Sequence, residues 1–193
     1  MANTARINTR SITGLAVLTA IVVVLQVLAA TIPIGIFQLT LVLVPIVVGS
    51  ALYGWIAGAW LGFVFGVVVL LTNAGVFLAV NIPGTILTCL CKGMITGALS
   101  GFVYKLLSRI NDIVATVAAA VLAPVCNTGV FLVGCLLFFA PTVKSWGYEN
   151  VWVYFTSALI LNFLIEVAVN IVLSPTIVRI VHIRHKRIHT SMK

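Results

Sequence analysis

The feature that most constrains this chain is an uncharged, apolar stretch of 34 residues at 39–72. A helix crosses the ~30 Å hydrocarbon core of a membrane with about 20 residues, so the stretch is too long for one crossing. A Tyr-Gly-Trp sequence at 53–55 interrupts it, and aromatic residues favour the boundary between lipid and water. The stretch therefore predicts a hairpin of two membrane helices, at about 39–53 and 56–72.

Apolar segments of similar length fill most of the remaining chain. Of the 193 residues, 62% are hydrophobic and only 7% are charged, which is too little charge for the surface of a soluble domain of this size. The first segment is longer than the apolar core of a secretory signal peptide, which favours a membrane helix there. The sequence predicts an all-α, polytopic membrane protein, a single domain built as a compact bundle of six transmembrane helices. We place the helices at about 12–30, 39–53, 56–72, 82–107, 113–139 and 151–178, with a basic tail at 179–193.

The basic residues are unevenly divided between the two membrane faces that six crossings imply. Both termini would share a face with the turn at 53–55 and the loop at 108–112. Only Lys144 lies on the opposite face. Cytoplasmic loops carry the excess of Lys and Arg, so both termini are predicted to be cytoplasmic. The basic residues of that face are Arg6, Arg10, Lys105, Arg109, Arg179, Arg184, Lys186, Arg187 and Lys193.

Small residues recur at helical spacing in three of the predicted helices. Every fourth residue is glycine at 58–66 and again at 93–101, and the first helix has a milder version in Ala16 and Ala20. Small residues let helix backbones approach closely, which matters in lipid because no hydrophobic force drives helices together. The glycines therefore predict a tightly packed bundle.

Two charged residues, Lys92 and Glu166, lie deep within the predicted membrane helices, away from the helix ends. A charged group in the bilayer costs at least ~2.5 kcal/mol, so each suggests a function. Counting along the helices places Lys92 about 15 Å and Asn127 about 18 Å from the outer face. Asn162, Glu166 and Asn170 recur every fourth residue and so share one helix face.

These polar residues allow two interpretations. Lys92 and Glu166 could pair and hold two helices together. Alternatively, Lys92 faces a ligand cavity in the outer half of the bundle and binds an anionic group. The amides of Asn127 and Asn162 would then orient the ligand, and Glu166 would tune Lys92 or a water network. The loops at 31–38, 73–81 and 140–150 would close such a cavity, and they could bring Asn73, Asn81 and Trp146 to the ligand.

The sequence lacks the motifs of several other functions. It contains no G-x-x-x-x-G-K-[ST] loop and no H-E-x-x-H pair, and its three histidines lie in the basic tail. The Lys and Arg residues form no basic surface interspersed with aromatic residues, of the kind that binds nucleic acid. We therefore predict neither an enzyme nor a nucleic-acid-binding protein, and no metal or cofactor.

Short stretches in five of the predicted helices are similar to those of one family of membrane proteins. The first helix contains Ala16-Val-Leu-Thr-Ala20, and the next two contain Leu43-Val-Pro-Ile-Val-Val-Gly and Leu61-Gly-Phe-Val-Phe-Gly. Lys92-Gly-Met-Ile-Thr-Gly and Asn127-Thr follow in the fourth and fifth. With six short helices and both termini inside, these stretches resemble the S-components of energy-coupling factor (ECF) vitamin transporters.

The resemblance implies the substrate-capture subunit of an ABC-type importer in the prokaryotic plasma membrane, which binds a vitamin or related micronutrient from outside. Its partners would be a transmembrane coupling subunit and two cytoplasmic ATPases, with Ala16 and Ala20 contacting the coupling subunit. Lys92 and Asn127 look most like pantothenate-type members, in which a basic residue, commonly arginine, binds a carboxylate. Lysine keeps the charge but not the bidentate fork, so other anionic or amide-rich substrates, such as relatives of cobalamin or queuosine precursors, stay open.

Two functions of other classes compete with capture. In an autonomous secondary transporter, Glu166 would couple transport to an ion or a proton. A structural assembly factor would bind no ligand, and its activity would survive the loss of the Lys92 charge.

Overall fold

The computed structural model describes residues 9–31 and 41–190, and these are almost entirely helical. Five helices are long and apolar enough to cross a membrane. A polytopic, all-α membrane bundle is therefore confirmed. The five are α1 (Thr9–Thr31), α3 (Trp55–Thr72), α5 (Ile82–Leu107), α6 (Asp112–Phe138) and α9 (Ile160–Thr190).

The helix expected at 39–53 is shorter than the sequence suggested. The structure has α2 at Leu43–Tyr53, and these 11 residues span only about 16 Å. Pro45 lies in the first turn of α2, where a missing N–H breaks no helical hydrogen bond, rather than in the middle of a helix. Most of α2 from Leu43 to Ser50 is buried, so this helix lies inside the bundle.

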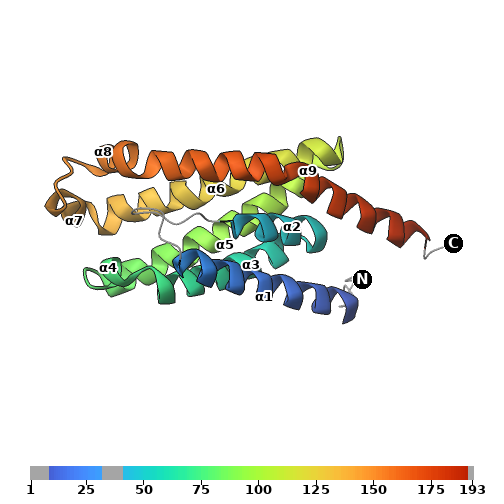
Figure 1. Ribbon diagram of the computed structural model, residues 1–193, viewed down its shortest axis with the longest axis horizontal. Coiled ribbons are helices and arrows are strands. Elements are labelled where there is room, and N and C mark those ends of the chain that lie inside the picture. The colour runs from blue at the N-terminus through green and yellow to red at the C-terminus, as the bar shows by residue number, and fades with distance from the viewer. Residues whose placement is uncertain (1–8, 32–40, 191–193) are drawn as a thin grey trace, which may run out of the picture.

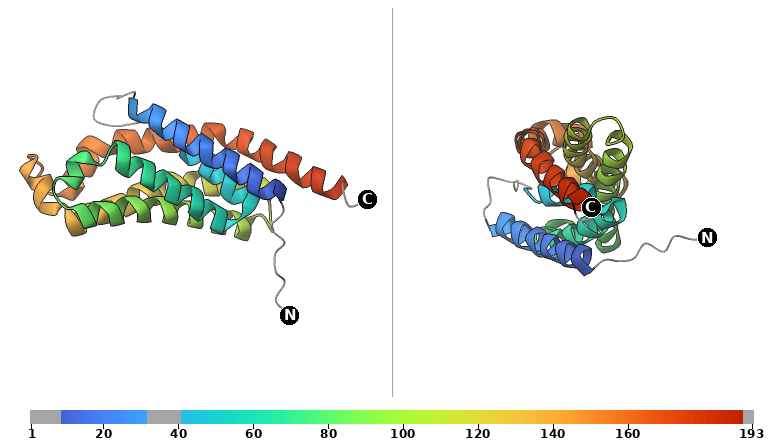
Figure 2. Two further views of the ribbon diagram at one scale, coloured as in Figure 1. Left: turned by 90° about the horizontal axis from the view of Figure 1, so that it is seen from below. Right: turned by 90° about the vertical axis from the view of Figure 1, so that its right-hand side faces the viewer.

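The two ends of the bundle differ in what they carry (Figure 1). The Thr9 end of α1, the late part of α9 and the α2–α3 turn lie at one end. The short helices α4 (Gly75–Leu78), α7 (Ala140–Ser145) and α8 (Val151–Tyr154) lie at the other. Figure 2 shows the same division from below and, viewed from one end, the long helices gathered into one bundle.

The segment expected as one helix at 151–178 consists of three consecutive pieces. After α8 comes η1 (Phe155–Leu159), a single wider π-helical turn, and then α9. The helix continues into the basic segment predicted at 179–193, as far as Thr190, the last residue that the structure describes. Pro175 lies within α9 without ending it.

Asparagine side chains mark the starts of three helices. Asn81 Oδ1 accepts the N–H of Gly84 at 2.9 Å, and Asn111 Oδ1 accepts that of Ile113 at 2.8 Å. Such side-chain caps satisfy N–H groups that the first helical turn leaves without partners. Asn150 caps α8 in the same way. Asn81, which the sequence offered as a possible ligand contact, thus holds the first turn of α5.

The two glycine rows meet each other along α3 and α5. A Cβ atom added to Gly62 would overlap the backbone carbonyl of Gly93, and one added to Gly58 would overlap that of Gly97. At Gly66 the added atom would lie 2.5 Å from the carbonyl oxygen of Cys89. The tight packing that the glycines predicted is confirmed: α3 and α5 touch backbone to backbone, and we call this contact the glycine seam.

Candidate ligand-binding site

A cavity of about 510 Å³ lies at the end of the bundle that carries α4, α7 and α8. Its volume is within the ~300–1,000 Å³ typical of small-molecule sites, and its wall is mainly apolar and aromatic with a few polar groups. The lining residues come from most helices of the bundle: Gln26, Phe65, Val69, Asn73, Ala74, Val76, Phe77, Thr85, Thr88, Cys89, Lys92, Phe131, Phe139, Trp146, Tyr148, Tyr154 and Leu159.

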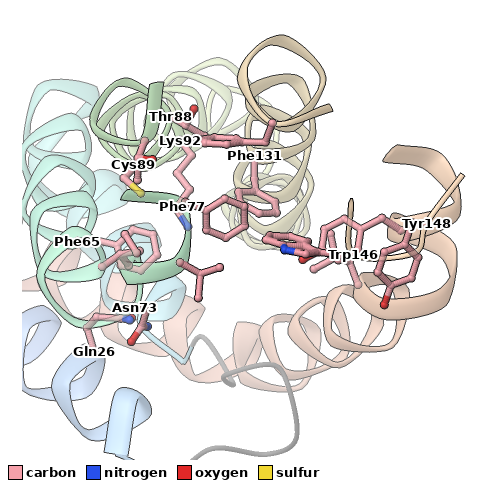
Figure 3. A pocket seen from close by; sticks show the side chains of 17 residues that line it. Gln26, Phe65, Asn73, Phe77, Thr88, Cys89, Lys92, Phe131, Trp146 and Tyr148 are labelled. Atoms are coloured by element: carbon pink, nitrogen blue, oxygen red, sulfur yellow. The ribbon is translucent and has the colours of Figure 1, made fainter. Parts of the chain in front are cut away.

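Lys92 supplies a positive charge to this cavity. Its Nζ atom lies 5.5 Å from the ring centroid of Phe65 on α3 and 5.5 Å from that of Phe131 on α6. The faces of aromatic rings attract cations, so the two rings hold the ammonium group in place without neutralising it. Figure 3 shows the amine reaching toward the space between Phe65 and Phe77. Lys92 directly precedes Gly93, so the glycine seam fixes the base of this side chain close to α3.

Two buried polar atoms of the cavity wall have no hydrogen-bond partner among the residues that the structure describes. They are Oε1 of Gln26, a residue that is 3% exposed, and Oγ1 of Thr88, which is 5% exposed. A buried polar atom without a partner costs about 1–3 kcal/mol, and most native structures hold only a few. Both atoms belong to residues that line the cavity, but the atoms themselves are buried in its wall, and Thr88 Oγ1 lies where α5 meets Gly134 of α6.

Gln26 and Asn73 form a second polar region of the wall. Figure 3 shows their amide groups close together, on the side of the cavity where α1 and the end of α3 meet. Asn73 follows α3 directly, and its backbone N–H donates to the carbonyl of Val69 at 2.9 Å. The cavity thus combines one cation from α5 with amides from α1 and from the end of α3.

Aromatic residues from the connecting segments cover the cavity. Phe77 on α4 lies edge-on to three other rings, with centroid separations of 5.7 Å to Phe131, 5.0 Å to Phe139 and 5.6 Å to Trp146. Tyr154 continues the cluster at 6.0 Å from Trp146. Edge-to-face contacts at these separations are favourable, so α4 and the segment after α7 are joined by ring contacts.

One of the four predicted ligand contacts lines the cavity, and three lie elsewhere on α6 and α9. Lys92 lines the cavity, whereas Asn127, Asn162 and Glu166 are not among the lining residues. Asn127 is buried on α6, one helical turn from Phe131, and its Oδ1 atom has no hydrogen-bond partner in the described part of the chain.

Glu166 lies on the buried face of α9 and is 2% exposed. Asn162 Nδ2 donates to Glu166 Oε1 at 3.2 Å, and Asn170 Nδ2 donates to the Glu166 backbone carbonyl at 2.8 Å. Within residues 9–31 and 41–190, no ion pair joins Lys92 to Glu166. The pairing considered from the sequence is therefore absent from this arrangement.

Several cavity residues were not singled out in the sequence. Asn73 and Trp146 were considered, but Gln26, Thr88 and the other aromatic residues were not. Gln26 did carry a signal, because it is a strongly polar side chain in the otherwise apolar run at 12–30. The aromatic residues carried none, because phenylalanine is common in any membrane helix.

Ala16 and Ala20, the residues expected to contact a coupling subunit, lie on the exposed face of α1. Val17, Ile21 and Val24 flank them and are 40–55% exposed. This face of α1 is apolar and is open to lipid or to a protein partner.

Comparison with known proteins gives two matches. A family model described as "ECF transporter, substrate-specific component" matches residues 10–178. The curated protein "Pantothenic acid transporter PanT" of Lactococcus lactis subsp. cremoris (strain MG1363) is 28% identical over 155 residues, which cover 72% of this chain and 75% of that protein. No solved structure matches the chain significantly.

Proposed function

Because the chain belongs to the family of ECF transporter substrate-specific components, which are prokaryotic membrane proteins and not enzymes, we propose that its cavity captures an anionic micronutrient of the pantothenate kind. Components of this family pair with an energising module of a coupling subunit and ATPases. The observation that carries the proposal is the Lys92 ammonium group in the cavity wall, held between two aromatic rings.

The chemistry of pantothenate suits the polar groups of this wall. The molecule has a carboxylate at one end, an amide in its middle and two hydroxyl groups toward the other end. Lys92 would bind the carboxylate, since a charge-assisted hydrogen bond is stronger than a neutral one. The amide groups of Gln26 and Asn73 would bind the amide and the hydroxyls, and the apolar remainder of the wall suits the carbon chain. The similarity to a pantothenate transporter supports the same ligand class.

We assign Asn127, Asn162 and Glu166 to the support of the cavity rather than to direct contact with the ligand. Asn127 lies one turn from Phe131, whose ring faces the Lys92 amine. The hydrogen bond between Asn162 and Glu166 fixes two side chains on the inward face of α9, next to the wall residue Leu159. In this role the three residues set the position of α6 and α9.

We also propose six membrane crossings with both termini in the cytoplasm. The α2–α3 turn and the late part of α9 lie at the end of the bundle opposite the cavity. Lys105 lies in the last turn of α5, and Arg109 follows that helix. An excess of basic residues marks the cytoplasmic side. The short helix α2 would be the inner part of the remaining crossing. The cavity then faces outward, as capture from outside requires.

Titration of the purified chain with two ligands tests the proposal. Pantothenate and its alcohol, in which CH₂OH replaces the carboxylate, differ only in the group that Lys92 would bind. Isothermal titration calorimetry should show binding of pantothenate, and the alcohol should bind about tenfold more weakly or worse, since hydrogen bonds to charged groups contribute about 1.5–3 kcal/mol. Equal affinities would mean that Lys92 does not bind the carboxylate. If neither compound binds, pantothenate is excluded as the ligand.

Reconstitution into liposomes separates capture from autonomous transport. The chain alone should bind pantothenate without moving it across the membrane, and uptake should require the coupling subunit, the ATPases and ATP. If the chain alone accumulates the solute in response to an ion gradient, the secondary-transporter interpretation with Glu166 as the coupling group is correct instead.

Enlarging Ala16 and Ala20 tests their proposed contact with the coupling subunit. Both are exposed, so the Ala16→Leu/Ala20→Leu variant should fold and bind ligand normally. Its recovery with the coupling subunit in a co-purification should fall at least about tenfold, because close helix packing depends on small residues. Ala168→Leu, which enlarges an exposed alanine on α9, should co-purify normally. Normal recovery of the double variant would place the interface elsewhere.

A further inference from the structure

A second hollow lies far from the ligand cavity, at the end of the bundle where α5 finishes. It has a volume of about 470 Å³ and is lined by Trp55, Phe102, Lys105, Leu106 and Arg109. The last four are spaced at i, i+3, i+4 and i+7, so they follow one face of α5 and its continuation into the next turn. Trp55 is the first residue of α3. We call this hollow the basic groove.

The wall of the basic groove is exposed and amphipathic. Trp55 is 48% exposed, Phe102 57% and Leu106 55%, and both cationic side chains are exposed as well. The close approach of α3 and α5 fixes the geometry, because a Cβ atom added to Gly101 would lie 2.7 Å from the Cα atom of Trp55. The groove is therefore a built depression between two helices held in contact, not a gap between independent segments.

The two cations of the groove have no acidic partner in the part of the chain that the structure describes. Asp112, the acidic residue nearest along the chain, contacts the hydroxyl group of Tyr104 at 3.5 Å. Lys105 and Arg109 form no ion pair with it or with any other described residue. Two like charges side by side without a counter-charge attract an anion, most strongly where the surroundings are partly apolar.

We propose that the basic groove binds an anionic glycerophospholipid, with its phosphate group between Lys105 and Arg109 and its glycerol and upper acyl chains against Trp55, Phe102 and Leu106. One observation and two general tendencies favour a lipid over a soluble anion. The apolar residues and the cations belong to one depression. Tryptophan and basic residues both favour the interface between lipid and water. Basic pockets between transmembrane helices on the cytoplasmic side also suit anionic lipid headgroups.

Native mass spectrometry of the delipidated full-length chain tests the inference. Phosphatidylglycerol should bind about 10- to 30-fold more tightly than phosphatidylcholine with the same acyl chains, which corresponds to the attraction expected from two basic residues. The Lys105→Ala/Arg109→Ala variant should lose this preference. The control Lys144→Ala/Arg179→Ala removes the same charge from exposed positions outside the groove and should keep it.

Further measurements distinguish a lipid headgroup from a soluble phosphate as the bound anion. Glycerol phosphate at the same concentration should not displace the lipid, and the double variant should still bind pantothenate and co-purify with the coupling subunit. Equal binding of both lipids, equal losses in both double variants or displacement by glycerol phosphate would overturn the proposal. Loss of coupling-subunit binding with an unchanged lipid preference would also overturn it and assign the groove to a protein partner. The lipid measurements require neither pantothenate nor transport, so the lipid proposal and the proposed function can fail separately.

Discussion

The Lys92→Met variant is expected to bind pantothenate about 30-fold more weakly than the unaltered chain, or not at all. Removing one partner of a buried charge pair typically costs about 2–5 kcal/mol, because the other charge loses its compensation. Methionine has a similar length, and its sulfur packs favourably on aromatic rings, so the contacts with Phe65 and Phe131 should survive. Calorimetry measures the loss of affinity, and thermal unfolding in detergent checks the fold.

Two comparison variants and a second ligand sharpen this result. Lys105→Met removes an exposed charge at the other end of the bundle and should leave pantothenate affinity unchanged. Lys92→Met should also bring the affinities for pantothenate and its alcohol together. Gln26→Leu should weaken binding while raising the unfolding temperature of the unliganded chain, since it removes a buried oxygen without a partner. If Lys92→Met still prefers the acid over the alcohol, another group binds the carboxylate.

The Gly62→Leu variant is expected to yield little or no folded protein. The new side chain would begin inside the backbone of α5 at Gly93, where no flexible side chain can move aside. Overpacking of a core typically costs about 1–3 kcal/mol and sometimes more, against a total stability of only about 5–15 kcal/mol. Separating α3 from α5 would also displace Phe65 from Lys92. Size-exclusion chromatography of a fluorescent fusion measures the monodisperse fraction.

A matched glycine separates the seam from a general intolerance of substitution. Gly129 lies within α6, and an added Cβ atom there meets nothing within 4 Å. Gly129→Ala should therefore leave the unfolding temperature unchanged or raise it slightly, because alanine favours the helix over glycine by about 1 kcal/mol. Gly62→Ala should lower it. Similar unfolding temperatures for the two alanine variants would show that the backbones of α3 and α5 can separate without loss.

The sequence predicted the features of this fold that depend on residue type and spacing along one helix. Apolar length identified the membrane helices, four-residue spacing identified the glycine seam, and the cost of a buried charge singled out Lys92. The start of α2 could not be predicted, because apolar residues fill both the helix and the segment before it. A proline such as Pro45 bends a longer helix or begins a shorter one, and the structure has it in the first turn of α2.

The site was only partly predictable, because depth along a helix is one coordinate of three. Asn127 was placed near the depth of Lys92, but depth does not say which face of a helix meets the cavity. That face is set by packing, which brings Gln26 to the wall and leaves Asn162 bonded to Glu166. The position of Phe77 depends on how the short helix α4 folds over the cavity, and no local pattern encodes it.

The glycine seam separates the part of the molecule that must stay constant from the part that can change. Its contacts are between backbones, so they restrict the glycines but place little demand on side chains that point elsewhere from α3 and α5. Gln26, Asn73, Phe77 and Trp146 come from other segments and can be exchanged without disturbing it. Relatives that share the seam are thus free to diverge in the nutrient they bind. The glycines alone therefore carry no information about substrate specificity.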